Sequence, residues 1–140
     1  MPSLAAIKAV ILHPSEPKFL AIKHNLNGKE IWDLPGGQID AGETPFETLH
    51  REAKEEVDLE IKIGKFLGFF WFLKELKPGE QVVCSVFQCT TENPEAHFHN
   101  FDETDGNIVG GKWVTKAEFL EDKFMVGHPS LKEVVKNIDL

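Results

Sequence analysis

The sequence predicts an α/β fold in which helices cover both faces of a β-sheet, an α/β/α sandwich. Apolar segments of strand-like composition stand on both sides of one amphipathic helix, expected at residues 45–57, and a second helix is expected at residues 130–137. Strands that are interrupted by one helix and followed by another favour this layering over an all-β barrel. A chain of 140 residues has the length of one domain, so residues 1–140 are expected to form a single domain.

Three strands are expected before the first helix. The turn-forming pairs His13-Pro14 and Asn27-Gly28 separate them. A third pair, Gly36-Gly37, follows Pro35 and predicts a tight turn, with residues 38–40 extended after it. The predicted strands are residues 4–12, 19–23 and 31–34.

The helix at residues 45–57 has a recognisable start and one apolar face. Thr44 is predicted to be the N-cap, Pro45 the first helical residue, and Glu47 the residue that completes a capping box. Four apolar residues recur at helical spacing and form the face directed at the core: Phe46, Leu49, Ala53 and Val57.

Two strands after the helix are expected to pair as an antiparallel hairpin. The first is residues 61–76, expected as one long strand or a bent pair with bulges at Gly64 and Gly68. The second is residues 81–90, and a turn at residues 77–80 joins the two. Residues 91–111 are polar and are expected to form a long loop, which in a compact domain is commonly functional. The chain is expected to end with a strand at residues 112–115, a helical turn at residues 116–121, and the terminal helix, capped by Ser130.

The composition excludes several classes of function. The formal net charge of −8 argues against polymeric nucleic acid as a partner, because Lys and Arg supply most of the grip on its phosphates. It does not exclude a nucleotide, whose phosphates a metal can neutralise. No membrane partner is expected, since the longest aromatic run, residues 66–73, is far too short to cross a bilayer. Cys84 and Cys89 are predicted to be reduced thiols in the core, which suits a cytoplasmic protein.

Three glutamates crowd one side of the predicted helix. Glu52, Glu55 and Glu56 are three and four residues apart, and like charges at these spacings cost an isolated helix roughly 0.2–0.5 kcal/mol per pair. A hard divalent cation would reverse the sign of that interaction, because Mg²⁺ takes oxygen ligands. A solvated acidic face is the alternative for the glutamates alone. Arg51 beside them and the glycine pair in front favour a functional site.

The stretch from residue 37 to residue 59 resembles the Nudix box, G-x5-E-x7-R-E-U-x-E-E-x-G-U, where U is a bulky apolar residue. The positions that match are, in order, Gly37, Glu43, Arg51, Glu52, Glu55, Glu56 and Leu59. The sequence departs from the pattern at Asp58, where the family has glycine, and Ala53 is small for its position. So many charged and glycine positions at fixed spacing are far more specific than a lone glycine motif.

The resemblance to MutT-like Nudix hydrolases implies a mixed β-sheet between the helices and a metal-dependent hydrolase. It implies that a divalent cation, Mg²⁺ with Mn²⁺ as the alternative, is held by the carbonyl of Gly36 and by Glu52, Glu55 and Glu56. Such a cation withdraws charge from phosphates and lowers the pKa of a bound water. The catalytic residues are expected to be Glu52, Arg51 and Glu56, with Glu52 as the candidate general base.

Further residues are expected at the edge of the site. Arg51 is expected to hold a glutamate bidentately, and Glu43 is a candidate for that partner or for a further metal or water contact. An ordinary helix salt bridge is the alternative for this pair. Glu103 and Asp105 lie in the predicted loop before the last strand, where related enzymes commonly place another acidic ligand, and simple solvation of the loop is the alternative.

The predicted function is a Mg²⁺-dependent hydrolase that cleaves the diphosphate bond of a nucleoside diphosphate linked to another group. A nucleoside triphosphate pyrophosphatase that releases the monophosphate and pyrophosphate is favoured, because the chain is short. The alternatives are a hydrolase of ADP-ribose, NDP-sugars or dinucleoside polyphosphates, and a non-catalytic nucleotide-binding Nudix module. Trp32 and Gly37 are expected to contact the substrate, and one face of residues 69–72 is a further stacking candidate. A monomer or a homodimer is expected.

Overall fold

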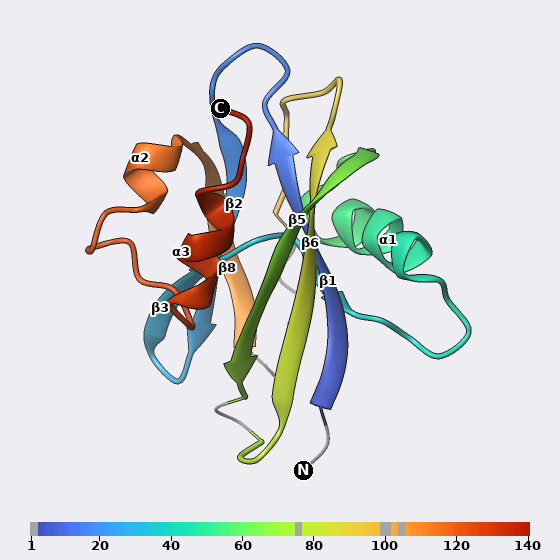
Figure 1. Ribbon diagram of the computed structural model, residues 1–140, viewed down its shortest axis with the longest axis vertical. Helices are drawn as coiled ribbons and strands as arrows, with labels where there is room; N and C mark the ends of the chain where they lie inside the picture. Colours follow the sequence, from blue (N-terminus) through green and yellow to red (C-terminus); the bar gives the residue numbers. More distant parts are fainter. Residues whose placement is uncertain (1–2, 75–76, 99–101, 104–105) are drawn as a thin grey trace.

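The computed structural model describes residues 3–74, 77–98, 102–103 and 106–140 (Figure 1). Within these residues an eight-stranded sheet lies between helix α1 (Pro45–Val57) on one face and helices α2 (Lys116–Phe119) and α3 (Ser130–Val135) on the other. The predicted α/β/α sandwich is therefore confirmed.

The sheet is mixed. Its strands are β1 (Ser3–Leu12), β2 (Phe19–Leu26), β3 (Lys29–Asp33), β4 (Gly36–Gln38), β5 (Lys62–Leu73), β6 (Gln81–Thr90), β7 (Asp102–Glu103) and β8 (Gly106–Val114). The order across the sheet is β5-β6-β1-β2-β8-β7, while β3 pairs with β2 and β4 pairs with β1. β1 and β6 run parallel, and β1 is antiparallel to β2 and β4. A parallel pair at the centre joins segments far apart in the sequence, which short-range patterns do not reveal.

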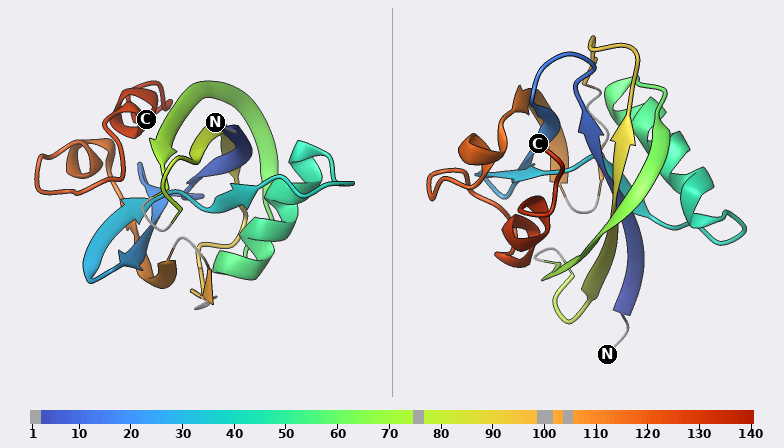
Figure 2. Two further views of the ribbon diagram at one scale, coloured as in Figure 1. Left: turned by 90° about the horizontal axis from the view of Figure 1, so that it is seen from below. Right: turned by 45° about the horizontal axis from the view of Figure 1, so that its top comes forward.

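β5 and β6 form the antiparallel hairpin that the sequence predicts. The register between them shifts twice, between Ile63 and Phe66 and between Phe66 and Gly68, at the predicted bulges. These shifts accompany the strong curve of β5 around the sheet, which both views of Figure 2 show.

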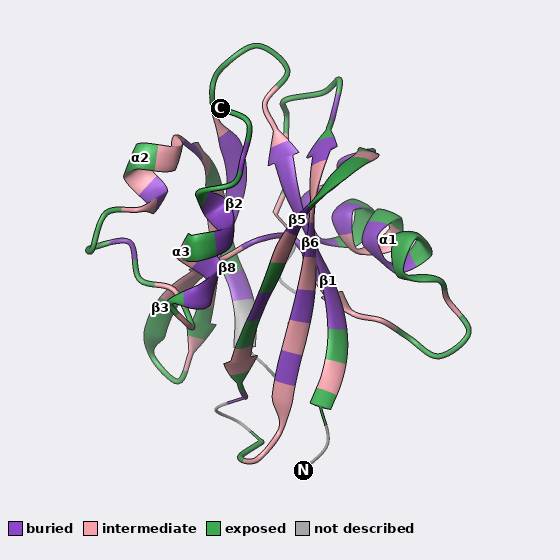
Figure 3. Ribbon diagram, viewed as in Figure 1, coloured by how far each residue is buried: buried purple, intermediate pink, exposed green. Residues whose placement is uncertain are grey.

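β1 separates two apolar cores, because successive side chains of a strand point to opposite faces. Ala6 and Val10 pack among residues of α2 and α3. Ile7 and Ile11 pack against the apolar face of α1. Figure 3 shows the resulting buried band through the central strands. The two cores fix α1 and α3 on opposite sides of one sheet, and the edges of both helices border the candidate site.

The glycine pair Gly36-Gly37 is not the tight turn that the sequence suggested. Gly36–Gln38 forms strand β4, in which Gly36 lies opposite Lys8 and Gly37 opposite Ile7 of β1. Gly36 has a φ of 142°, and a Cβ added there would collide with the backbone carbonyl of Ile7. Glycine is thus needed for a close approach between strands, and the local turn signal could not distinguish the two cases.

Two predictions near the C-terminal end are wrong. β8 begins at Gly106, so the last strand is longer than residues 112–115 and the preceding loop is shorter. Ser130 is the first residue of α3 rather than its N-cap. Its hydroxyl instead accepts from the backbone N–H of Trp71 at 3.1 Å and donates to the carbonyl of Trp71 at 3.2 Å. Ser130 therefore ties α3 to the outer edge of β5.

Candidate active site

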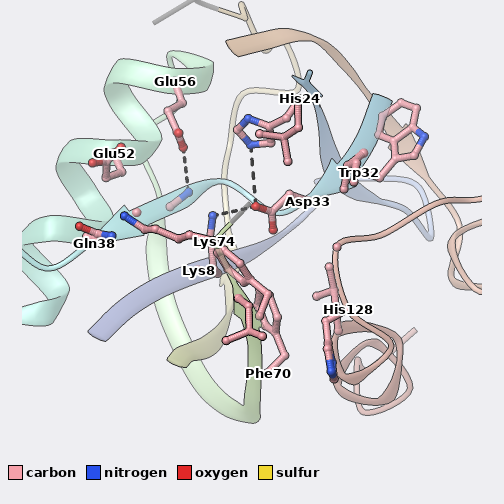
Figure 4. A pocket seen from close by; sticks show the side chains of 18 of the residues that line it. Lys8, His24, Trp32, Asp33, Gln38, Glu52, Glu56, Phe70, Lys74 and His128 are labelled. Carbon is pink, nitrogen blue, oxygen red and sulfur yellow. Dashed lines mark hydrogen bonds and ion pairs between the residues drawn. The ribbon is translucent and has the colours of Figure 1, made fainter. Parts of the chain in front are cut away.

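A cavity of about 380 Å³ lies between α1, strands β1, β3, β4 and β5, and the start of α3 (Figure 4). Its acidic side is formed by α1 and the segment before it, with Asp40, Glu52, Glu55 and Glu56. Basic and aromatic residues complete its lining: Lys8, His24, Phe70, Phe72, Lys74 and His128. The cavity thus combines acidic, basic and aromatic groups.

Local interactions orient α1 toward the cavity. The N–H of Thr44 donates to Glu47 Oε1 at 2.8 Å, and the N–H of Glu47 donates to Thr44 Oγ1 at 3.2 Å, which completes the predicted capping box. Three fully buried apolar side chains anchor the helix to the sheet: Leu49, Ala53 and Val57. Because this face is fixed on the core, the glutamates on the adjacent face border the cavity.

Glu56 is a buried carboxyl group on the acidic side. Its residue is only 7% exposed, and its Oε1 accepts a hydrogen bond from the N–H of Gly36 at 2.8 Å. Burial, together with the nearby charges of Glu52 and Asp33, raises the pKa of Glu56 to about 8 despite the opposing charge of Lys8. A nearby cation would stabilise the ionised form of such a group.

Gly37 leaves room for the carboxylate of Glu52. A Cβ at residue 37 would lie 2.8 Å from Glu52 Oε1 and 2.9 Å from its carboxyl carbon. Any larger residue would therefore displace the carboxylate from β4.

Arg51 connects the acidic side chains around the start of α1. Its Nε and Nη2 donate to the two carboxylate oxygens of Glu43, both at 3.0 Å, which is the bidentate pairing anticipated for these residues. Its Nη2 also contacts Asp40 at 3.0 Å, while Nη1 contacts Glu52 at 3.2 Å and Glu55 at 3.1 Å. Hydrogen bonds from Arg51, and then from the Thr48 hydroxyl, lower the pKa of Glu43. Arg51 therefore holds the carboxylates of two helical turns in one arrangement.

The carboxylates offer the donor set that a hard divalent cation takes. In the described part of the chain, no three His, Cys, Asp or Glu side chains converge tightly enough to hold a metal ion. The hydrogen bonds explain this, because Glu52 and Glu55 are turned to Arg51 and Glu56 is turned to Gly36. The oxygen-only donors fit a cation chemically. The buried Glu56 also fits, because the ammonium of Lys8 beside it is already bonded to Asp33.

A charged pair in the cavity, Lys8 with Asp33, was not predicted from the sequence. Lys8 Nζ donates to Asp33 Oδ2 at 3.0 Å, and His24 Nε2 lies 3.8 Å from the same oxygen. Burial alone would lower the pKa of Lys8, but the neighbouring charges, chiefly that of Asp33, raise it above its usual value. The sequence held one signal of this site, since Lys8 is the one charged residue in the apolar run at residues 4–12.

The predicted aromatic contacts fall into two groups. Trp32 borders the cavity, but its ring stacks on Phe124 with a centroid distance of 4.6 Å and an interplanar angle of 22°. Phe70 and Phe72 line the cavity, whereas Phe69 and Trp71 point to the other face of β5 and are exposed. The alternation of β5 therefore selects Phe70 and Phe72 as the stacking candidates of that run.

The candidate acids before the last strand cannot be placed in the site. Asp105 lies outside the described residues, and for Glu103 the structure describes the backbone, paired in β7 with Gly106 of β8, but not the side chain.

In the described residues no helix is long and apolar enough to cross a membrane.

Comparisons with known proteins agree on one family. A family model described as NUDIX domain matches residues 3–135. Phosphatase NudJ of Escherichia coli K12 is 36% identical over 114 residues, which cover 81% of this chain and 69% of NudJ. The solved MutT NUDIX hydrolase from Burkholderia pseudomallei is 18% identical, with a TM-score of 0.75 over 99% of both chains. A NUDIX hydrolase from Nitrosomonas europaea is also 18% identical, with a TM-score of 0.74 over 97% of this chain and 88% of that one. At these identities the solved structures support the fold alone.

Proposed function

Because the chain belongs to the Nudix hydrolase family, we propose that it hydrolyses a phosphoanhydride bond of a nucleoside triphosphate and releases the monophosphate and pyrophosphate. Residues 1–140 would act as one catalytic domain. The observation that carries the proposal is Glu56, a buried carboxyl group with a raised pKa that lies beside Glu52 and is bonded to the glycine strand. Strongly perturbed carboxylates in a cavity mark functional sites.

Hydrolases of this family generally use a divalent metal, and we propose Mg²⁺, with Mn²⁺ as a substitute. Glu52, Glu55, Glu56 and the carbonyl of Gly36 would hold it. When bound, the ion neutralises phosphate charge and acidifies a water molecule.

The remaining catalytic roles belong to side chains of this chain. Glu52 would accept the proton of the attacking water, since its carboxylate lies in the cavity next to Gly37 of β4. Arg51 would act as a positioning residue, because its guanidinium is bonded to Glu43, Glu52 and Glu55 and orients the last two. Glu43 would support Arg51 rather than contact the substrate.

The aromatic part of the cavity lining would bind the rest of the nucleotide. Phe70 and Phe72 offer apolar surface for a base, and Gly37 and Trp32 border the same cavity. Trp32 would contact the substrate at the rim, although its ring is partly occupied by Phe124. Glu103 and Asp105 stay candidates for an additional acidic ligand. A cytoplasmic location and a monomeric or homodimeric state are part of the same proposal.

The name of one relative favours a second candidate activity. NudJ is named a phosphatase, and a phosphatase releases the terminal phosphate rather than pyrophosphate. The two activities break different bonds of the same substrate. Further candidate substrates are ADP-ribose, NDP-sugars and dinucleoside polyphosphates, and a nucleotide-binding module without catalysis is the last candidate.

Product analysis tests these proposals together. The protein would be incubated with a nucleoside triphosphate and Mg²⁺, and the products separated by ion-exchange chromatography. Equal amounts of monophosphate and pyrophosphate are expected. Diphosphate and phosphate would support the phosphatase activity instead. Turnover of ADP-ribose with triphosphates left intact would contradict the proposed substrate, and no turnover of any of them would support the binding module.

A further inference from the structure

The ammonium group of Lys8 has hydrogen-bond donors that find no acceptor in the part of the chain that the structure describes. An ammonium group carries three N–H donors. Within the described part of the chain, Lys8 Nζ donates one side-chain hydrogen bond, to Asp33 Oδ2 at 3.0 Å. Its side chain is only 8% exposed, so bulk water has little access to the remaining donors. A buried ammonium with spare donors at the wall of a cavity is suited to an anionic ligand.

Two more polar groups line the same cavity. Gln38 Nε2 is buried and meets no hydrogen-bond acceptor among the described residues. Lys74, at the end of β5, brings a second buried positive charge: its side chain is only 4% exposed, and its Nζ forms an ion pair with Glu80 Oε1 at 3.7 Å. Figure 4 draws Lys8, Lys74 and Gln38 in the same part of the cavity, between the glutamates of α1 and Phe70.

These groups are separate from the arginine on the acidic side. Arg51 donates five hydrogen bonds to the carboxylates of Asp40, Glu43, Glu52 and Glu55, so its donors are used within the protein itself. Lys8 and Lys74 come from β1 and from the residue that follows β5, and both line the cavity. Their positive charges are therefore available to an anionic group bound in the cavity.

We propose that Lys8, Gln38 and Lys74 form a subsite for the terminal phosphate of the substrate. The inference rests on the proposed function and narrows its substrate class to compounds with a free terminal phosphate, such as nucleoside triphosphates. ADP-ribose and NDP-sugars have an internal diphosphate and no terminal phosphate, so they do not use this subsite. The same donors would hold the phosphate or pyrophosphate that leaves after cleavage.

Binding of inorganic pyrophosphate to the metal-free protein tests the subsite without requiring catalysis. Isothermal titration in EDTA would compare the wild-type protein with Lys74→Met and with the charge-neutral pair Lys8→Met/Asp33→Asn, which leaves no unpaired buried carboxylate. Lys123→Met is the control, because Lys123 lies outside the cavity and its side chain is 80% exposed. Each cavity variant should bind pyrophosphate about tenfold more weakly or worse, and the control should match the wild type. Circular dichroism and thermal melts would show that each variant is folded.

Equal pyrophosphate affinity in the wild type and in a folded Lys74→Met variant would overturn the subsite, as would undetectable binding to the wild type. Steady-state turnover with Mg²⁺ separates this failure from failure of the proposed function. Lys74→Met should raise KM for a nucleoside triphosphate severalfold and leave KM for ADP-ribose, if it is a substrate, unchanged. Turnover of triphosphates by a wild-type protein that does not bind pyrophosphate would contradict the subsite but not the proposed hydrolase activity.

Discussion

At the scale of single residues, the environment of Glu56 decides what its side chain can do. Burial of the carboxyl group and the nearby charges of Glu52 and Asp33 raise its pKa to about 8, although the charge of Lys8 and the hydrogen bond from Gly36 oppose the shift. A surface glutamate on the same helix, such as the half-exposed Glu55, has no such burial. One position in the acidic cluster therefore differs physically from its neighbours, although all are the same residue type.

Glu56→Gln should stabilise the metal-free protein at alkaline pH. The folded-state pKa of Glu56, about 8, lies above the ordinary value of 4.5. Between those values the unfolded state binds fewer protons than the folded state, so this group makes folding less favourable as pH rises from about 4.5 to about 8. Gln keeps the acceptor for Gly36 and removes the titration. In EDTA, the variant should melt several degrees above wild type at about pH 8 and close to wild type at about pH 5.

Glu55→Gln is the matched control for that measurement. It removes one carboxylate from the same helix at a half-exposed position. An equal pH-dependent gain in both variants would show that general repulsion along α1, not burial of Glu56, is responsible.

Gly37→Ala and Gly36→Ala should fail in different ways. The added methyl group at residue 37 meets the flexible end of Glu52, so the protein should fold while kcat falls roughly tenfold or more through displacement of that carboxylate. The methyl group at residue 36 meets the backbone of Ile7 at a φ of 142°, so this variant should lose several degrees of thermal stability or fail to fold. Melting curves and steady-state kinetics on both variants test this difference. Equal losses of thermal stability and of kcat in the two variants would contradict it.

At the scale of elements, α1 was largely predictable and its surroundings were not. The capping box at Thr44 and Glu47 is a local pattern, and the structure reproduces it. The pair Gly36-Gly37 resembled a turn in the sequence. Its glycines are instead required by the close approach of β1, which lies far earlier in the chain. Ser130 resembled an N-cap, but its hydroxyl is bonded to β5. Local sequence patterns therefore predicted α1, whereas β4 and the start of α3 depend on hydrogen bonds between residues far apart in the sequence.

The same division applies to the site. Glu52, Glu55 and Glu56 were predictable because their spacing on one helix brings them together. Lys8 and Asp33 were not, because they meet only when β1 and β3 are both placed beside the cavity.

The end of α1 provides a test of helix capping. Asp58 closes the helix with φ 57° and ψ 40°, the left-handed geometry expected at the position where the resembled pattern has glycine. Asp58→Gly should match or exceed the wild-type stability by up to about 1 kcal/mol, and Asp58→Ala should lose about 1 kcal/mol. Both should keep full activity. Chemical denaturation and turnover assays check this, and a loss of activity in the glycine variant would show that the carboxylate of Asp58 takes part in the chemistry.

At the scale of the whole molecule, two apolar cores hold α1 and α3 against opposite faces of one sheet, and residues of both helices line the cavity. The protein as a whole carries a formal charge of −8, while two basic groups of the cavity, Lys8 and Lys74, are buried. An anionic substrate therefore approaches a molecule of net negative charge and meets the buried positive charges of Lys8 and Lys74 inside the cavity.

This charge distribution predicts an increase of kcat/KM with salt at low ionic strength. Salt screens exposed charges strongly and buried pairs much less. Raising the ionic strength from about 0.01 M to about 0.15 M with Mg²⁺ held constant should increase kcat/KM severalfold. A steady decrease of kcat/KM over that range would show that attraction between the substrate and exposed positive charges, not repulsion by the net negative charge, governs substrate binding.

The most direct test of the central proposal is Mg²⁺-dependent turnover of a nucleoside triphosphate by the wild type, Glu52→Gln and Glu56→Gln. The wild type should release monophosphate and pyrophosphate only when the cation is present. Both variants should remain folded and lose turnover by about two orders of magnitude or more, since each lacks an expected ligand or base. Turnover near the wild-type level in both folded variants would contradict the assignment of this site.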